Sequence, residues 1–288
     1  MRRRTLTLLA AATAVALTAA ATAVPANARP AQVVGSHAKG FSHAAASAAA
    51  TTATPLLDKG GLVLTTSTTY AIYWGPATGF PTDLQAGMTA LLSGFSGSTY
   101  LATANQYMRG KIAATTYGGS FVDTSAPPTK NPSTTVIAAE VAKVLTANKL
   151  ATNPNAIYMV FSSNLPKVNY CAWHAGATVN AVKTQIAYMP NTALTTGCYP
   201  TANLTIPAPA VQYSYGTRSI ADNTAHEFME AITDPQPSTG WVDSAGAEIG
   251  DKCNFVYNSL TTLSGTNNVW QIQAEWSNAI NGCAQTTP

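Results

Sequence analysis

The sequence predicts an α+β fold, in which helices and a mixed sheet form one globular domain over residues 59–288. Helical and strand-like segments mix along this region with neither a strict strand–helix–strand rhythm nor an internal repeat. Of the 288 residues, 46% are hydrophobic and only 9% are charged, which differs from the charge-rich composition of disordered chains. A single packed domain is therefore expected.

The expected elements follow from apolar periodicity and from the turn residues that end each segment. Ser133 is placed to cap a helix whose apolar stripe includes Ile137, Val141 and Val144. Another helix is expected to start at Ser219 and to stop before Pro235. In order, the predicted helices are 82–94, 133–148 and 220–233, and the predicted strands are 62–64, 70–74, 111–117, 156–161, 185–189 and 269–276.

The first 58 residues are not expected to belong to the domain. Residues 1–28 have the basic start, the apolar middle and the Ala-Asn-Ala ending of a signal peptide. A membrane anchor is the other interpretation, but threonines interrupt the apolar run and a cleavage site follows it. Residues 29–58 are rich in Ala, Ser and Thr and are predicted to be flexible. A secreted, extracellular protein is expected, with no membrane attachment after cleavage.

The charge balance argues against nucleic acid as a partner. The chain has 15 basic and 12 acidic residues, and three of the basic ones, Arg2, Arg3 and Arg4, lie in the leader. Removing them leaves 12 of each sign, whereas nucleic-acid binding needs a basic excess. We expect a monomer whose substrate or partner is a peptide or a cell-wall polymer.

Four cysteines in an exported chain indicate disulfides. Three pairings are possible, and the pairs closest in sequence, Cys171 with Cys198 and Cys253 with Cys283, are preferred. A cysteine metal site is disfavoured because the sequence has no C-x-x-C.

The most informative pattern is a cluster of acids in a chain that has few charges. Crowded carboxylates raise one another's pKa unless a positive charge, such as a bound cation, neutralises them. Seven of the 12 acidic residues lie between positions 222 and 251: Asp222, Glu227, Glu230, Asp234, Asp243, Glu248 and Asp251.

Within this cluster, His226 and Glu230 are one turn apart on the helix face opposite its apolar arc. The pattern is that of an H-E-x-x-H metal site with Glu230 replacing the second histidine. Glu227 then takes the place of the general base that acts on a metal-bound water. The alternative interpretation is an ordinary solvent-exposed helix face.

Further ligands are expected from a second acidic loop, at Glu248 and Asp251, and from His174 in a loop beside Cys171. The alternative for His174 is a loop histidine packed near Trp173. The expected cofactor is a divalent metal, with Zn²⁺ the first candidate, and the oxygen-rich set also suits Ca²⁺.

With these motifs in view, residues 60–285 resemble the EXORDIUM / phosphate-induced protein family of secreted proteins. The stretch from Ala225 to Ala231 is similar to the family's A-H-E-L-A-E, and Glu248 to Cys253 resembles its E-I-(A/G)-D-x-C. Cys171 to His174 resembles its C-G-x-H, and the Trp276 to Cys283 ending is also similar. The resemblance implies an extracellular, often wall-associated protein, but it implies no established reaction. The order of elements around the 220–233 helix is, in addition, similar to the zincin arrangement.

Three functions remain open from the sequence. The first is a secreted metal-dependent hydrolase, a zinc-metallopeptidase-like enzyme with Glu227 as base. The second is a non-catalytic extracellular or wall-associated protein with a structural cation. The third is a carbohydrate-active enzyme that pairs Glu227 or Glu230 with Glu248 across a sugar groove.

Overall fold

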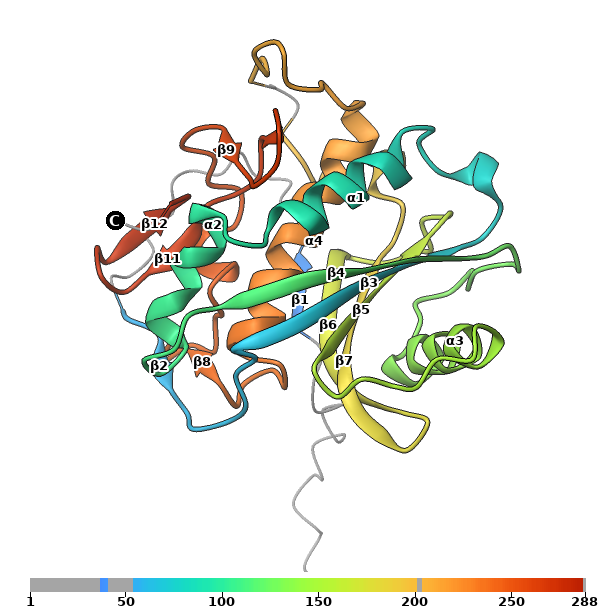
Figure 1. Ribbon diagram of the computed structural model, residues 1–288, viewed down its shortest axis with the longest axis horizontal. Coiled ribbons are helices and arrows are strands. Elements are labelled where there is room, and N and C mark those ends of the chain that lie inside the picture. The colour runs from blue at the N-terminus through green and yellow to red at the C-terminus, as the bar shows by residue number, and fades with distance from the viewer. Residues whose placement is uncertain (1–36, 41–53, 201–203, 287–288) are drawn as a thin grey trace, which may run out of the picture. The chain divides into compact units, whose positions relative to one another are not determined.

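The structure, a computed structural model, describes residues 37–40, 54–200 and 204–286 (Figure 1). The expected signal peptide and most of the segment 29–58 lie outside these residues. The described part is α+β, as predicted. Its elements are β1 (His37–Gly40), β2 (Leu57–Asp58), β3 (Thr66–Trp74), η1 (Ala77–Gly79), α1 (Leu84–Gly94), α2 (Thr99–Ala102), η2 (Thr103–Tyr107), β4 (Ala114–Asp123), α3 (Thr134–Ala147), β5 (Ala156–Ser162), β6 (Tyr170–Val179), β7 (Val182–Met189), η3 (Thr192–Leu194), α4 (Tyr215–Thr233), β8 (Trp241–Val242), η4 (Asp251–Cys253), β9 (Thr261–Thr262), β10 (Val269–Trp270), β11 (Glu275–Ser277) and β12 (Gly282–Ala284).

A six-stranded mixed sheet, in the order β1-β6-β7-β5-β3-β4, forms the centre of the domain. Strands β4, β3, β5 and β7 run parallel, and β6 returns antiparallel to β7. The β6–β7 turn consists of Asn180 and Ala181, both at positive φ, as a tight two-residue hairpin requires. Strand β1 pairs antiparallel with β6, and His37 lies opposite His174 in the register. Regular structure thus occurs in the segment that was expected to be flexible.

Helices cover both faces of this sheet. Helices α1 and α4 pack on one face, where Ala71, Met159 and Ala187 belong to the same core cluster. Helix α3 packs on the other face against alternate residues such as Ile72 and Val160, and Figure 1 shows it apart from α4. Because successive strand residues point to opposite faces, His174 shares the α4 face with Ala172.

Helix α4 begins earlier than the sequence predicted. Its N-cap is Ser214, whose side chain accepts the N–H of Thr217, so the prediction that the helix starts at Ser219 is wrong. The carboxylate of Asp83 fixes this end, because it accepts hydrogen bonds from the backbone and side chain of Ser214. The sequence alone could not decide between Ser214 and Ser219, because either serine is locally plausible as an N-cap.

Most of α4 is buried on every side, from Thr217 to Thr233. Phe228 stacks on Phe95 with ring centroids 4.4 Å apart, which joins α4 to the end of α1. The opposite side of α4, which carries its acids, lies under β6 and the loop before η4. The interpretation of that side as a solvent-exposed helix face is therefore wrong for His226, Glu227 and Glu230.

Three other predicted elements differ from the structure. No strand forms at 62–64, and β3 begins at Thr66 instead. The Cys171–His174 segment, expected to be a loop, is part of β6, because the hairpin with β7 supplies its hydrogen-bond partners. The single strand expected over 269–276 is divided into β10 and β11, which pair with β9 and β12. Alternation of side chains predicted extended backbone there, but it carries no information about the pairing partner.

The disulfides are Cys171–Cys198 and Cys253–Cys283, the pairs preferred from the sequence. The first joins β6 to the segment before α4, and the second joins η4 to β12. Each therefore fixes an element beside the acidic cluster. Disulfides of this kind are typical of proteins from oxidising compartments. No helix in the described ranges is long and apolar enough to cross a membrane.

Glu140 on α3 makes the stability of this fold depend on pH. Its carboxyl group is buried, and burial together with a hydrogen bond to Asp123 raises its pKa to about 7, although Lys143 opposes this shift. The folded state therefore binds more protons than the unfolded state between about pH 4.5 and 7. The free energy of unfolding should fall as the pH rises through this range.

Glu140→Gln is expected to remove this pH dependence, because the amide keeps the hydrogen bond to Asp123 and does not titrate. At pH 8 the variant should be more stable than the wild type by about 1–2 kcal/mol. Urea unfolding of both proteins at pH 5 and pH 8 measures the difference. Parallel pH profiles would contradict the assignment.

Candidate metal centre

Three of the seven clustered acids make their contacts away from His174 and His226. Asp222 accepts hydrogen bonds from the backbone of Gln273 and from the hydroxyl of Tyr257. Asp234 accepts the backbone N–H groups of the 238–240 turn that follows α4. Asp243 pairs with Lys252 at 3.1 Å. These carboxylates stabilise loops, and they leave Glu227, Glu230, Glu248 and Asp251.

Those four acids and two histidines form one group, which we call the His/Glu cluster: His174, His226, Glu227, Glu230, Glu248 and Asp251. Helix α4 contributes three of the residues, and β6 contributes His174. The loop before η4 contributes Glu248, and Asp251 is the first residue of η4. All are buried except Asp251, whose side chain is 18% exposed. The structure thus brings together every residue that the sequence predicted as a ligand or base.

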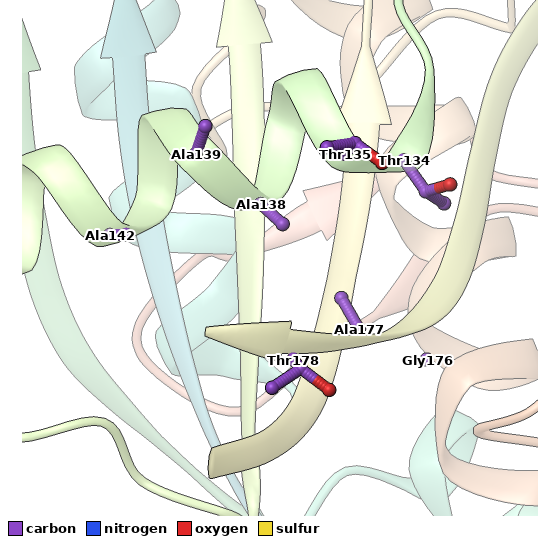
Figure 2. A pocket seen from close by; sticks show the side chains of 8 residues that line it. All are labelled: Thr134, Thr135, Ala138, Ala139, Ala142, Gly176, Ala177 and Thr178. Carbon is purple, nitrogen blue, oxygen red and sulfur yellow. The ribbon is translucent and has the colours of Figure 1, made fainter. Parts of the chain in front are cut away.

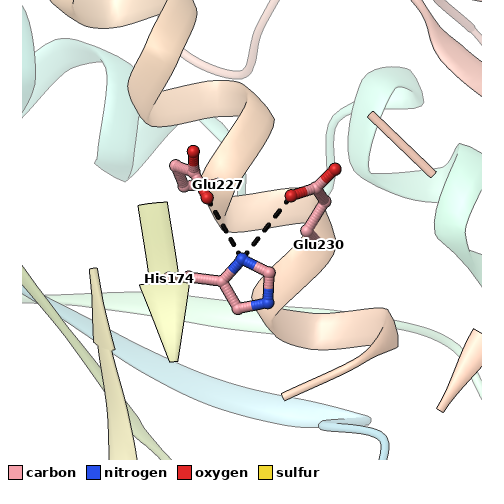
Figure 3. A group of neighbouring side chains, drawn as sticks. All are labelled: His174, Glu227 and Glu230. Atoms are coloured by element: carbon pink, nitrogen blue, oxygen red, sulfur yellow. Dashed lines mark hydrogen bonds and ion pairs between the residues drawn. The ribbon is translucent and has the colours of Figure 1, made fainter. Parts of the chain in front are cut away.

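His174 lies between three of the carboxylates. Its Nδ1 is 3.1 Å from Oε2 of Glu227 and 3.5 Å from Oε2 of Glu230, as Figure 3 shows. On the other side of the ring, Nε2 lies 3.2 Å from the backbone carbonyl of Asp234 and 3.6 Å from Oε1 of Glu248. An Nε2–H that donates to this carbonyl leaves the Nδ1 lone pair directed at the two glutamates.

His226 contacts the other side of Glu230. Its Nε2 lies 3.1 Å from Oε1 of Glu230 and 3.9 Å from Oδ1 of Asp251. Glu230 therefore has one carboxylate oxygen next to each histidine. Two sets of donor atoms are close enough to hold a cation: His174, Glu227 and Glu230 form one, and His226, Glu230 and Asp251 form the other.

The electrostatics of the cluster favour positive charge at the His174 ring. Burial acts to lower the pKa of His174, but the charge of Glu248 and the hydrogen bond to Glu227 raise it well above the usual value. Burial raises the pKa of Glu227 and that of Glu248. Burial would also raise the pKa of Glu230, but the charge of His226 and the close contacts with both histidines lower it instead.

Gln273 is a site residue that the sequence did not reveal. Its Nε2 lies 2.8 Å from Nδ1 of His226 and 3.0 Å from the carbonyl of Gly250. With its Nε2 donating to the Gly250 carbonyl and to Nδ1, Gln273 holds the Nε2–H tautomer of His226, and turning the amide to accept from Nδ1–H would break the bond to Gly250. The tautomer with Nδ1–H directs the Nε2 lone pair at Glu230 and Asp251, which suits metal binding. The alternation of 269–276 was the only sequence signal, and it did not indicate which side chain reaches His226.

Gly250 sets the space available beside His226. A Cβ atom at this position would lie 2.7 Å from Nδ1 of His226 and 3.1 Å from Oε1 of Glu230. Gly250→Ala is therefore expected to displace the imidazole and to weaken divalent-cation affinity about 10-fold or more. Competition with a chromophoric chelator measures this affinity.

Gly282→Ala is the matched control for this substitution, because its Cβ would meet nothing closer than an oxygen at 3.8 Å. It should bind cation as the wild type does. Equal affinities for both variants would show that the Gly250 space is not part of a cation site.

A separate pocket lies on the α3 side of the sheet. Its volume is about 410 Å³, and Figure 2 shows it between α3 and the end of β6. It is lined by Ala, Gly and Thr residues, none of which titrates. The pocket therefore supplies no acid, base or charged ligand to the His/Glu cluster.

Comparisons with known proteins add little to this geometry. No family model and no curated protein matches the chain. Among solved structures, part of the chain is similar to the crystal structure of metalloproteinase-II from Bacteroides fragilis, at 8% sequence identity and a TM-score of 0.28. The match covers 47% of this chain and 40% of that one. The chemistry of the site accordingly follows from its own residues.

Proposed function

We propose that the protein is a secreted metal-dependent hydrolase that acts on peptides. The observation that carries this proposal is the buried Glu230 carboxylate, which lies between two histidines and beside further acids. Buried carboxylates are costly unless a positive charge compensates them. Among the described residues, Glu227 and Glu230 form ion pairs with His174 and His226. Histidine is a common metal ligand in proteins.

His226, Glu230 and Asp251 are the proposed ligands of a divalent cation, with Zn²⁺ as the first candidate. Such a cation would supply Lewis acidity to polarise a carbonyl group and to acidify a coordinated water. Asp251 is the most exposed member of the cluster, so substrate is expected to approach from its side.

Glu227 is the proposed general base. Its Oε2 is held by His174, whereas its Oε1 is buried without a hydrogen-bond partner among the described residues and is available to a proton. Burial raises the pKa of this carboxyl group, which favours its role as a proton acceptor.

A structural cation in a non-catalytic protein is the second candidate. The disulfide at Cys253 and the burial of the cluster favour it, because both hold the 248–251 loop against α4. The carbohydrate-active alternative has less support. Glu227, Glu230 and Glu248 all lie around the single His174 ring and are buried, so no open sugar groove separates them.

The deciding experiment combines elemental analysis of the purified mature protein with hydrolysis of a broad peptide library. Bound divalent metal and hydrolysis that a chelator abolishes would support the hydrolase. Metal without hydrolysis would leave the structural cation. Absence of metal after incubation with Zn²⁺, Mn²⁺ or Ca²⁺ would reject both.

A further inference from the structure

We infer that the His/Glu cluster is a binuclear centre, in which the carboxylate of Glu230 bridges two divalent cations. This inference rests on the proposed function and extends it by one cation. His226, Glu230 and Asp251 hold the first ion, and His174, Glu227 and Glu230 hold the second.

The distances between donor atoms suit two ions. Nitrogen and oxygen donors at about 2.0–2.2 Å from a tetrahedral ion lie about 3.4 Å from each other. Around His226, the spacings are 3.1 Å to Glu230 and 3.9 Å to Asp251. Around His174, they are 3.1 Å to Glu227 and 3.5 Å to Glu230.

The orientation of Glu230 indicates a bridge. Its Oε1 lies beside His226 and its Oε2 lies beside His174, so no single ion has to accept both oxygens. A carboxylate that offers one oxygen to each of two ions can hold them at the separation of about 3.5–4 Å found in two-metal hydrolytic sites.

A buried carboxylate oxygen that accepts no hydrogen bond from a described residue supports the second ion independently. Oε2 of Glu230 is fully buried, is directed at His174, and has no hydrogen-bond partner in the described ranges. A positive charge must lie between Nδ1 and the two carboxylate oxygens, and a divalent cation that displaces the Nδ1 proton would supply it. The carbonyl of Asp234 orients the ring for this arrangement, as the outer partners of metal-bound histidines do.

The charge count agrees with two ions. The cluster has four carboxylates, those of Glu227, Glu230, Glu248 and Asp251, and two divalent cations would balance them. One divalent ion would leave two buried negative charges to be compensated in another way. The mixture of imidazole and carboxylate donors suits Zn²⁺ or Mn²⁺.

The test is the number of ions bound per chain. Mature apoprotein is loaded with Zn²⁺ or with Mn²⁺, passed over a desalting column and analysed for metal, and the Mn²⁺ sample is examined by electron paramagnetic resonance for magnetic coupling between ions. We expect two ions per chain in the wild type, and a coupled Mn²⁺ pair.

Two variants and a control separate the sites. Glu227→Gln and Asp251→Asn are each expected to retain one ion and to lose the coupled signal. Glu140→Gln, which changes a buried glutamate on the opposite face of the sheet, should retain two. Circular dichroism confirms that each variant is folded.

One ion in the wild type, retained in Glu227→Gln, would overturn the bridge and leave the proposed hydrolase intact. Two ions without magnetic coupling, and with neither variant losing one, would place the second ion elsewhere and also overturn the bridge. No ion in the wild type would reject the bridge and the proposed function together.

Discussion

Glu230→Gln is expected to lose both cation binding and hydrolysis, which is the largest effect that this structure predicts. Glu230 contacts both histidines, and its replacement removes the one negative charge that both donor sets share. Loss of the cation removes several kcal/mol of transition-state stabilisation, so kcat/KM should fall about 10³-fold or more. Metal analysis and peptide hydrolysis on the same preparation measure both effects.

The melting temperature provides a second measurement. A ligand that binds only the folded state stabilises it by about 2.7 kcal/mol at 100 times its Kd. Chelator should therefore lower the melting temperature of the wild type and leave that of Glu230→Gln unchanged. Glu140→Gln is the control, and it should respond to chelator as the wild type does. A Glu230→Gln protein that retains its metal would show that Glu230 is not a ligand.

Local patterns predicted the main elements of the fold. The apolar stripe after Ser133 predicted α3 and its N-cap, and the short apolar run at 156–161 predicted β5. The start of α4 and the breaking of the 269–276 strand were not predictable, because partners distant in sequence decide them. Asp83 fixes the start of α4 through its hydrogen bond to Ser214. Pairing of β10 with β9 and of β11 with β12 divides the 269–276 segment.

The residues of the His/Glu cluster were predicted because acids are scarce elsewhere in the chain, but their arrangement was not. The sequence placed His226 and Glu230 one turn apart, and the structure agrees. It could not indicate that β6 directs His174 at the same glutamate, because that contact depends on the β6–β7 hairpin packing against α4. The packing also buries the acids, which changes the expected chemistry from that of a solvated helix face to that of a charged interior.

The resemblance to the EXORDIUM family remains a prediction, since no family model matches the chain. The structure does give a physical role to the motifs on which it was based. Glu248 and Asp251 lie beside the two histidines, and Cys253 ties their loop to β12. These motifs therefore meet at one site, whichever family the chain belongs to.

Glu227→Gln should distinguish an enzyme from a protein with a structural cation. The amide keeps the size of the side chain and can still contact His174, but it cannot take a proton. If Glu227 is the base, the variant should fold, keep the cation held by His226 and Glu230, and lose about 10²–10⁴-fold in kcat. In a non-catalytic protein the same change would alter only stability and metal content. Rates on the best peptide of the library, with metal measured in parallel, separate these outcomes. A Glu227→Gln protein that hydrolyses peptide at the wild-type rate would remove Glu227 from the mechanism.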